Sequence, residues 1–130
     1  MGGEVVYLHW LTQNPCFIRG AILLVGLGSK DRYYYNVIVK PGFRGQGIGR
    51  TAQQQFLVLA ANEGIERLIS YIESENRCAQ HVFQLLGYEI LTKVWSYRMM
   101  GIRYGNYYNA DSGALIRRFM NRCEQQYYWI

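Results

Sequence analysis

The most constraining feature of the sequence is a β-forming segment that runs into a glycine-rich turn and then into a helical pattern. The segment Val37-Ile38-Val39 stops at Pro41, and glycines follow at positions 42, 45, 47 and 49. Proline ends a strand because it cannot donate to the ladder, and glycines let backbone N–H groups approach an anion closely. Apolar residues at helical spacing follow from Ala52 to Ala60. Because a helix start favours negative charge, this segment predicts a phosphate or pyrophosphate site.

Three anion-binding motifs compete for this turn. The P-loop motif fails because Arg50 stands in its lysine position and Arg44 in its first glycine position. The dinucleotide fingerprint Gly-x-Gly-x-x-Gly fails because Arg50 takes the place of its third glycine. The third pattern, Arg/Gln-x-x-Gly-x-Gly/Ala after a strand, is satisfied throughout by Arg44-Gly45-Gln46-Gly47-Ile48-Gly49.

A second segment strengthens the third pattern. About 30 residues further on, after an apolar segment at Arg67–Ile72, a helical pattern carries Asn76, Ala79, Phe83, Gly87 and Tyr88. These residues stand at the spacing Asn-x-x-Ala-x-x-x-Tyr-x-x-x-Gly-Phe, with Phe83 in the tyrosine position. The two segments together resemble the GNAT acyltransferase superfamily. The resemblance covers about half of the chain, from Tyr33 to Tyr97.

The resemblance implies acetyl-CoA as cosubstrate, no metal, and direct transfer of the acetyl group to an amine. The turn amides would hold the CoA pyrophosphate, the strand before the turn would pair with the pantetheine arm, and the second segment would line the opposite side. The sheet would splay between the Tyr33–Val39 and Arg67–Ile72 strands to admit that arm. The implied cofactor-binding residues are Val37, Ile38, Val39, Arg44, Gly45, Gln46, Gly47, Ile48, Gly49, Arg50, Asn76, Ala79 and Phe83.

The catalytic residues are less well marked than the cofactor segment. Phe83 cannot donate a proton to a leaving thiolate, so another group must do so or the thiolate leaves unaided. Glu73 is the candidate base, because Tyr33 to Asn36 occupy the stretch where many family members carry a Glu. Tyr35 is a candidate proton donor. The alternative readings are a solvated carboxylate or a salt-bridge partner for Glu73, and a core or groove-lining residue for Tyr35.

The remaining pattern predicts a mixed α/β domain of the order β-β-β-α-β-α-β-β-α, with a mostly antiparallel sheet and helices on both faces. We expect strands at 4–11, 17–27 and 33–39, with a hairpin signal at Gly28–Asp31, and two further strands within 88–100. The glycine- and tyrosine-rich stretch Gly101–Asn109 is expected to be a loop. The resemblance implies that residues 1–110 form a GNAT-like acyl-CoA-binding domain. Residues 111–130 add an amphipathic helix, since Leu115, Phe119, Cys123 and Tyr127 are four apart.

Composition limits the cellular compartments and the classes of partner that are expected for this chain. Three distant cysteines exclude a disulfide scaffold and suit a reducing, cytoplasmic location. No apolar run reaches the roughly 18 residues of a membrane span, so no membrane partner is expected. A net charge of +5 favours an anionic partner and, with the twelve tyrosines, leaves an RNA- or tRNA-acting protein as one alternative. Phe83 and the short opening segment leave a catalytically weak or inactive CoA-binding module as another. The short opening segment and the many aromatic residues predict a homodimer.

Overall fold

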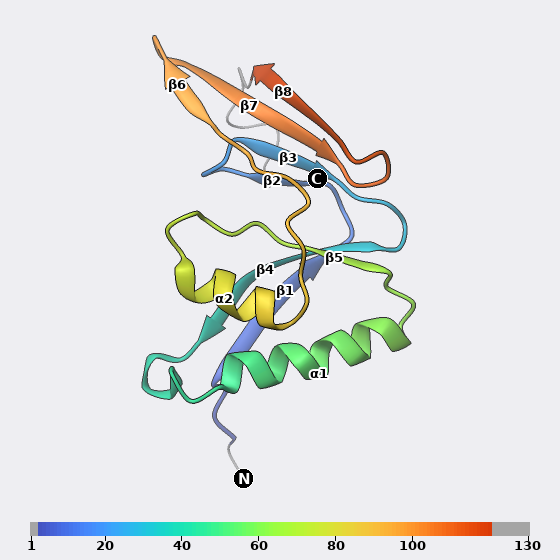
Figure 1. Ribbon diagram of the computed structural model, residues 1–130, viewed down its shortest axis with the longest axis vertical. Coiled ribbons are helices and arrows are strands. Elements are labelled where there is room, and N and C mark those ends of the chain that lie inside the picture. Colours follow the sequence, from blue (N-terminus) through green and yellow to red (C-terminus); the bar gives the residue numbers. More distant parts are fainter. Residues whose placement is uncertain (1–2, 121–130) are drawn as a thin grey trace. The chain divides into compact units, whose positions relative to one another are not determined.

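The computed structural model describes residues 3–120 of the chain, and residues 118–120 through their backbone alone. The elements are β1 (Tyr7–Thr12), β2 (Cys16–Ile18), β3 (Leu23–Gly26), β4 (Asp31–Val39), the 3₁₀ helix η1 (Pro41–Phe43), α1 (Ile48–Asn62), β5 (Arg67–Ile69), α2 (Arg77–Leu85), β6 (Tyr97–Met99), β7 (Ile102–Asn109) and β8 (Ala114–Met120) (Figure 1). They form two compact units. The first unit comprises Met1–Leu11 and Tyr34–Glu89, and the second comprises Thr12–Tyr33 and Ile90–Ile130.

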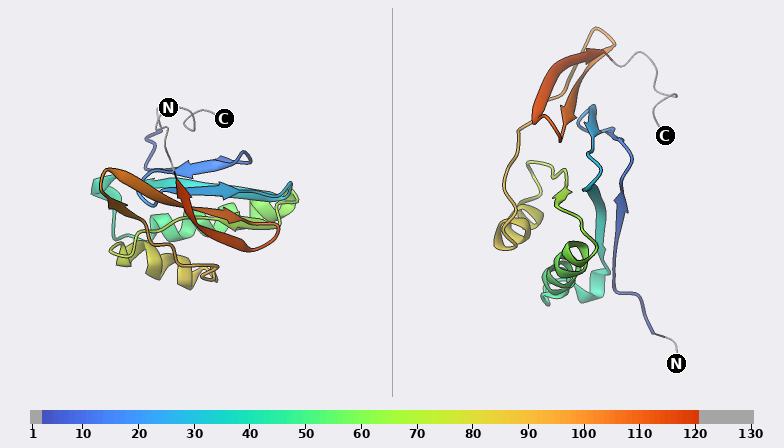
Figure 2. Two further views of the ribbon diagram at one scale, coloured as in Figure 1. Left: turned by 90° about the horizontal axis from the view of Figure 1, so that it is seen from above. Right: turned by 90° about the vertical axis from the view of Figure 1, so that its right-hand side faces the viewer.

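The first unit is a three-stranded sheet, in the order β1-β4-β5, with two helices on one face. Tyr34 of β4 shows this arrangement, because its ring stacks on Phe56 of α1 at 5.5 Å and meets Phe83 of α2 at 6.0 Å between centroids. One side chain points to one face of a sheet, so both helices cover the same face, as Figure 2 shows. The prediction of helices on both faces is wrong in this unit, although the mixed α/β class is confirmed.

The two helices begin and end where the sequence predicts. Gly47 is the N-cap of α1 at φ +77°, and Gly64 follows the helix at φ +77°. Asn76 caps α2 by accepting a hydrogen bond from the Ala79 N–H at 3.1 Å, and Gly87 follows that helix at φ +84°. Left-handed backbone conformations at these ends are easiest for glycine. The glycine positions therefore fix the helix boundaries in the sequence itself.

The second unit is a sheet in the order β2-β3-β7-β6, with β8 paired to β7. The β3–β7 pair is parallel and the other pairs are antiparallel. The prediction of a loop at Gly101–Asn109 is wrong, because β7 occupies Ile102–Asn109 and pairs with three strands. The stretch is rich in tyrosine, which favours strands. Its glycines serve the hairpin turn at Gly101 and a buried position at Gly105.

The predicted carboxy-terminal helix is wrong where the structure describes it. Residues Ala114–Met120 form strand β8 in antiparallel register with β7. The Asn109 side chain accepts hydrogen bonds from the N–H groups of Asp111 and Ser112, at 2.9 and 3.2 Å, and Gly113 has φ +65°. This turn closes a hairpin instead of starting a helix. The rest of the predicted helix, from residue 121, lies outside the described residues.

Three smaller differences concern strand extent and pairing. The Gly28–Asp31 turn forms, with Asp31 N–H bonded to the Gly28 carbonyl at 3.1 Å, but β3 and β4 belong to different sheets. The predicted 17–27 strand is two short antiparallel strands, β2 and β3. Of the segment from 88 to 100, only Tyr97–Met99 is a strand. Within residues 3–120, no helix is long and apolar enough to cross a membrane.

Candidate functional site

The glycine-rich turn is a short, open connection between β4 and α1. It contains η1, closed by the Phe43 N–H on the Lys40 carbonyl at 2.9 Å, and then Gly45 and Gly47 at φ +75° and +77°. A Cβ at Gly45 or Gly47 would meet no protein atom within 4 Å. The glycines are therefore required by the backbone conformation, and the space in front of them is open to a ligand.

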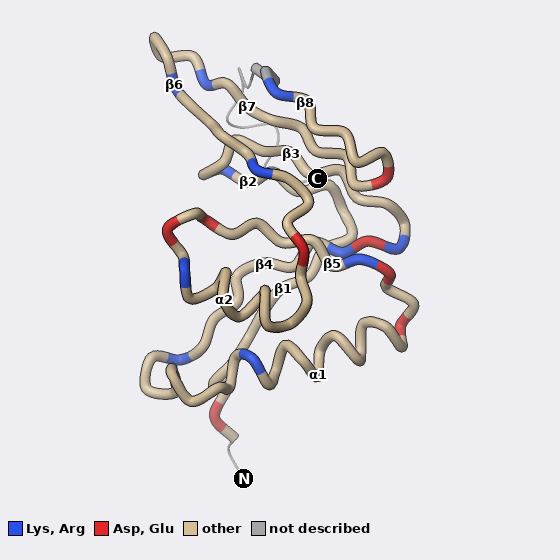
Figure 3. The backbone as a smooth tube through the Cα atoms, viewed as in Figure 1, with Lys and Arg blue, Asp and Glu red and all other residues tan. Residues whose placement is uncertain are grey.

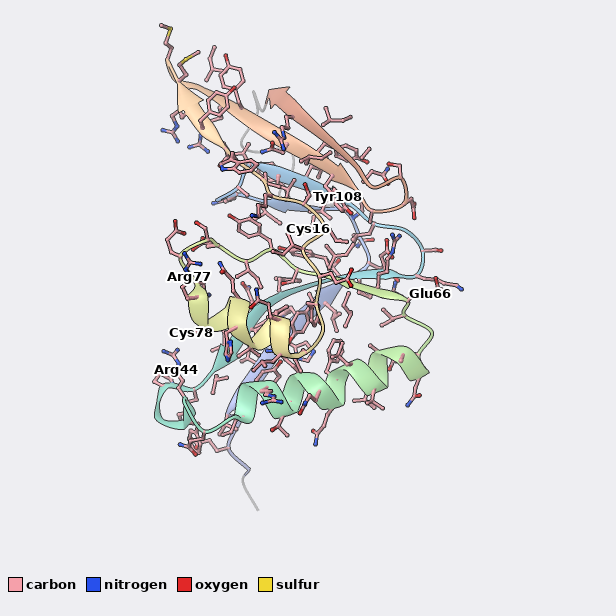
Figure 4. The ribbon with its side chains drawn as sticks, in the orientation of Figure 1. Cys16, Arg44, Glu66, Arg77, Cys78 and Tyr108 are labelled. Atoms are coloured by element: carbon pink, nitrogen blue, oxygen red, sulfur yellow. The ribbon has the colours of Figure 1, made fainter. Side chains whose placement is uncertain are left out.

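The start of α1 directs free donors into this turn. The first α-helical hydrogen bond runs from the Thr51 N–H to the Gly47 carbonyl at 3.0 Å. The N–H groups of Ile48, Gly49 and Arg50 therefore have no acceptor within the helix. Arg44 and Arg50 are both exposed at this turn, and Arg44 is labelled in Figure 4. Free amides, the helix dipole and two guanidinium groups suit a phosphate or pyrophosphate.

Three contacts hold the turn in shape. The Arg44 Nε donates to the Val39 carbonyl at 3.0 Å, which ties the side chain back to the end of β4. The Gln46 Nε2 donates to the Gly42 carbonyl at 3.2 Å. A Cβ at Gly49 would lie 3.1 Å from Val39 Cγ2, so the absence of a side chain lets α1 approach β4 closely. Two of the motif's polar residues thus build the turn itself.

The end of β4 extends past its short neighbour β5. β4 has nine residues and β5 has three, so β5 pairs with only part of β4. Beyond Ile69 the chain leaves the direction of β4 in the views of Figures 1 and 2. At the turn end of β4, Val37 and Val39 are half-buried and Ile38 is 45% exposed. The two strands are hydrogen-bonded neighbours, so any splaying of the sheet between them lies beyond the three residues of β5.

Helix α2 places its three predicted cofactor residues in different environments. Asn76 is exposed, and its side-chain oxygen caps the helix. Ala79 is half-buried, and its N–H is the donor in that cap. Phe83 is 7% exposed, and its ring meets the rings of Tyr34 and Tyr88 at 6.0 and 4.6 Å. Asn76 and Ala79 lie at the helix start, whereas Phe83 belongs to the core.

The two predicted catalytic residues lie on different segments. Glu73 is exposed in the segment between β5 and α2, beyond the strand end at Ile69. Its backbone carbonyl accepts hydrogen bonds from the Asn76 N–H and from the Gln80 Nε2, both at 3.0 Å. Burial raises the pKa of the neighbouring Tyr71, and the Glu73 and Glu75 charges raise it further. Tyr35 is half-buried in β4.

An aromatic cluster that the sequence did not indicate fills the sheet face under the helices. The hydroxyl groups of Tyr7 and Tyr34 are hydrogen-bonded at 2.6 Å. Burial raises the pKa of both tyrosines, and it raises the pKa of Tyr88 to about 12. The His9 ring lies 5.0 Å from Tyr34 and 4.5 Å from Phe56, and burial lowers its pKa.

Only a weak sequence signal precedes this cluster. Tyr7 and His9 are two apart on β1 and so share a face of the strand. This spacing could have shown that Tyr7 and His9 share a face, but it does not show which residues of other elements that face contacts. The buried hydroxyl pair depends on β1 and β4 being neighbours, which is a long-range feature of the fold.

Comparison with known proteins identifies the family. Residues 5–88 match the model of the acetyltransferase (GNAT) family, and the chain belongs to that family. The chain is 31% identical over 87 residues to a mycothiol acetyltransferase of Kytococcus sedentarius, a match that covers 67% of this chain and 25% of the relative. It is 30% identical to the mycothiol acetyltransferase of a Nocardioides species, covering 67% and 28%. The chain thus spans about a quarter of the length of these relatives.

Solved structures show the same fold. AAC(6')-Iy in complex with the bisubstrate analogue CoA-S-monomethyl-acetylneamine superposes with a TM-score of 0.55 at 23% identity, covering 76% of this chain and 65% of that one. A putative acetyltransferase from Agrobacterium tumefaciens gives a TM-score of 0.53 at 18% identity, covering 75% and 62%. The family match ends at Tyr88, so β6, β7 and β8 lie beyond it.

Proposed function

We propose that this protein transfers an acetyl group from acetyl-CoA to an amine. The observation that carries the proposal is the turn before α1, where open space at Gly45 and Gly47 faces the free amides of the helix start. Membership of the GNAT family and relatives named as acetyltransferases support the same chemistry. The curated relatives are named mycothiol acetyltransferases, and one solved structure holds the bisubstrate analogue CoA-S-monomethyl-acetylneamine, so we propose a small polar amine as acceptor.

The proposed cofactor contacts divide between the turn and the two flanking elements. The amides from Arg44 to Arg50 would receive the pyrophosphate, with Arg50 adding charge. The turn end of β4, at Val37 to Val39, would pair with the pantetheine arm, and its amides would donate to the thioester oxygen. Asn76 and Ala79 would line the other side. Arg44 is proposed chiefly to hold the turn closed, because its guanidinium already bonds Val39.

Replacement of Gly47 by Val tests the cofactor site. The new side chain would project into space that no protein atom fills, so it should block the ligand and not the fold. We expect Gly47→Val to abolish the rise in melting temperature that CoA produces. Release of CoA thiol from acetyl-CoA, in a screen of small amines, should also be lost.

The matched control is Gly64→Val. Gly64 has the same φ of +77° and the same absence of neighbouring atoms, but it lies at the other end of α1. A side chain in a left-handed conformation costs about 1–2 kcal/mol at either position, so both variants should lose similar stability. If Gly47→Val binds CoA as the control does, the turn is not the cofactor site.

Glu73 and Tyr35 are the proposed acid–base pair. Bound acetyl-CoA supplies the acetyl group as a thioester. The Glu73 carboxylate would take the proton that the amine nitrogen loses as it attacks, and the Tyr35 hydroxyl would give a proton to the departing sulfur. Gln80 and Asn76 hold the Glu73 backbone and thereby fix the segment that carries the base.

Substitution of these residues should lower turnover without changing CoA affinity. General acid or base catalysis contributes about 10²–10⁴-fold, so we expect Glu73→Gln and Tyr35→Phe each to lower kcat by about 100-fold or more. Glu75→Gln is the control, since Glu75 is an exposed carboxylate two residues away that Ser74 already engages. Rates equal to those of Glu75→Gln would remove Glu73 as the base.

A CoA-binding module with weak or no transferase activity is the second candidate. It is favoured by Phe83, which offers no hydroxyl group and is buried in the core. The two candidates separate in one experiment. A module raises its melting temperature with CoA but releases no thiol with any amine in the screen, whereas an acetyltransferase does both.

We also propose a cytoplasmic homodimer. The outer edge of β8 pairs with no further strand among the described residues, and an unpaired edge can accept a second copy. Cys16 and Cys78 are free thiols, which suits a reducing compartment. A single 15.2 kDa species in light scattering at micromolar concentration would exclude the dimer.

A further inference from the structure

The side chains of strand β4 change their facing partway along the strand. Tyr34 faces the helices, because its ring stacks on Phe56 of α1 at 5.5 Å between centroids. Val39 also faces α1, because a Cβ at Gly49 would lie 3.1 Å from its Cγ2. Residues five apart on a regular strand point to opposite faces of the sheet. The alternation is therefore interrupted once between Tyr34 and Val39, which is the effect of a β-bulge.

Asn36 is the residue at which the facing changes. Its φ is +50°, and no other residue of β4, which the structure describes in full, has a positive φ. Asparagine takes this left-handed conformation more readily than most residues other than glycine. Val37 shares the helix face with Val39, two residues further on. Because neighbouring side chains alternate, Tyr35 next to Tyr34 and Asn36 next to Val37 both point away from the helices.

The Asn36 side chain is available to a ligand. The residue is exposed, and its carboxamide makes no hydrogen bond to another described residue. A carboxamide offers an oxygen acceptor and an NH₂ donor at one position. No Lys, Arg, Asp or Glu lies between Tyr33 and Val39, and β4 is drawn in tan over this stretch in Figure 3. This part of β4 therefore offers a ligand neutral hydrogen-bonding groups and no formal charge.

The proposed cofactor position brings the reacting carbon close to Asn36. In that position β4 pairs with the pantetheine arm from Val39 back to Val37, because the turn after Val39 receives the pyrophosphate. The thioester end of the arm then lies at Val37. A strand advances about 3.3 Å per residue, so Asn36 lies one such step beyond the thioester. An amine that attacks the acetyl carbon comes within reach of the Asn36 side chain.

We propose that the Asn36 carboxamide binds a hydroxyl group next to the reacting amine of the acceptor. A hydroxyl group both donates and accepts, so it pairs with either end of the carboxamide. A site that hydrogen-bonds a substrate hydroxyl rejects the analogue without it, because the polar groups of the site would be left unpaired. A second ammonium group or a carboxylate would find no opposite charge on this part of β4. The proposal rests on the acetyl transfer proposed above and narrows its acceptor to an amino alcohol, a class that includes amino sugars.

Acetyl transfer to two amines that differ by one hydroxyl group tests this proposal. The probes are trans-2-aminocyclohexanol and cyclohexylamine, and release of CoA thiol is followed at saturating acetyl-CoA. The unaltered protein should use the aminocyclohexanol with a kcat/KM about tenfold higher, through a lower KM. Asn36→Gly removes the carboxamide and keeps a residue that takes positive φ. It should bring the ratio of the two kcat/KM values to about one, with the CoA melting shift of the unaltered protein.

Two further variants separate the side chain from the backbone. Asn36→Ala also lacks the carboxamide, but alanine is strained at positive φ. Its melting temperature should therefore fall below that of Asn36→Gly, whereas its preference between the two amines should be the same. Asn62→Gly is the matched control, since it removes an exposed carboxamide at the end of α1. This variant should keep the preference of the unaltered protein.

Three results overturn the proposal. They are equal use of the two amines by the unaltered protein, a preference that survives in Asn36→Gly, and thiol release with other amines of the screen but with neither probe. Failure of the proposed acetyl transfer is distinguishable, because no amine in the screen then releases thiol. The specificity proposed for Asn36 falls with it in that case.

Discussion

His9 is a titratable side chain placed among aromatic rings. Its ring lies within 5.6 Å of the rings of Tyr7, Tyr34 and Phe56, measured between centroids. Its Nδ1 is buried and has no hydrogen-bond partner. No charged group stands among these ring contacts, and burial lowers the pKa of the imidazole. The side chain therefore stabilises the fold through packing and opposes it through an unsatisfied nitrogen.

The lowered pKa makes stability depend on pH. Below its ordinary value of about 6.5, the histidine of the unfolded chain gains a proton that the folded protein resists. The free energy of unfolding should therefore fall as pH drops through this value, and the fall should end below the folded-state pKa. His9→Phe should remove this part of the pH dependence. It should also add about 1 kcal/mol at neutral pH, by removing the unsatisfied atom.

Urea unfolding at several pH values measures both effects. His81→Phe is the control, because His81 is exposed on α2. If His9→Phe keeps the pH slope of the unaltered protein, the histidine is not the group responsible.

Single residues were predictable from sequence where their identity answers a local backbone requirement. Gly47, Gly64 and Gly87 all have positive φ at helix ends, and Asn76 is an N-cap. These requirements are met within a few residues of chain. The partners of His9 come from β1, β4 and α1 together, and no local pattern specifies them.

At the level of elements, the carboxy-terminal region shows why periodicity misled. Leu115 and Phe119 are four apart, but Ala114–Met120 also satisfies a strand with β7 as its neighbour. An Asn109 turn and Gly113 precede it, and these form a hairpin. Apolar spacing alone does not separate the two readings over seven residues, because pairing with a distant strand decides between them. Helix α1 is longer and has glycines at both ends, so its apolar spacing was not open to a strand reading.

Helix α2 offers a prediction about its cap. Asn76→Ala removes the acceptor of the Ala79 N–H and should cost about 1 kcal/mol of stability. Asn76→Asp keeps an acceptor at the same position, so it should restore most of that loss. Urea unfolding of the two variants checks this expectation, and equal losses would show that the cap is not the stabilising contact. If CoA affinity falls in both variants alike, the amide itself contacts the cofactor.

At the level of the whole molecule, the net charge conceals a division. By sequence, the net charge of +5 favours an anionic partner without choosing between a cofactor and a nucleic acid. In the structure, the first unit holds the turn before α1 but only five Lys and Arg residues against six Asp and Glu. The positive charge belongs to the second unit. The proposed cofactor site would therefore depend on the local amides and on Arg44 and Arg50, and not on the net charge of the unit that carries it.

The two units should nevertheless unfold together. β1 and β4 each run without a break across the boundary between them, at Leu11 to Thr12 and at Tyr33 to Tyr34. Loss of either unit would remove residues from strands that the other needs for pairing. Trp10 lies in the first unit and Trp95 in the second, so each can report on one of them.

Two variants isolate these reporters, because Trp129 is the remaining tryptophan. One replaces Trp95 and Trp129 by Phe and leaves Trp10, and the other replaces Trp10 and Trp129 and leaves Trp95. We expect urea transitions followed by fluorescence to coincide with circular dichroism in each variant, as two-state unfolding requires. CoA should raise the urea midpoint reported by Trp10 and the one reported by Trp95 by the same amount, since a ligand of the folded state stabilises the whole cooperative unit. Separate midpoints for the two probes, or a CoA shift confined to the Trp10 reporter, would show that the shared strands do not couple the units.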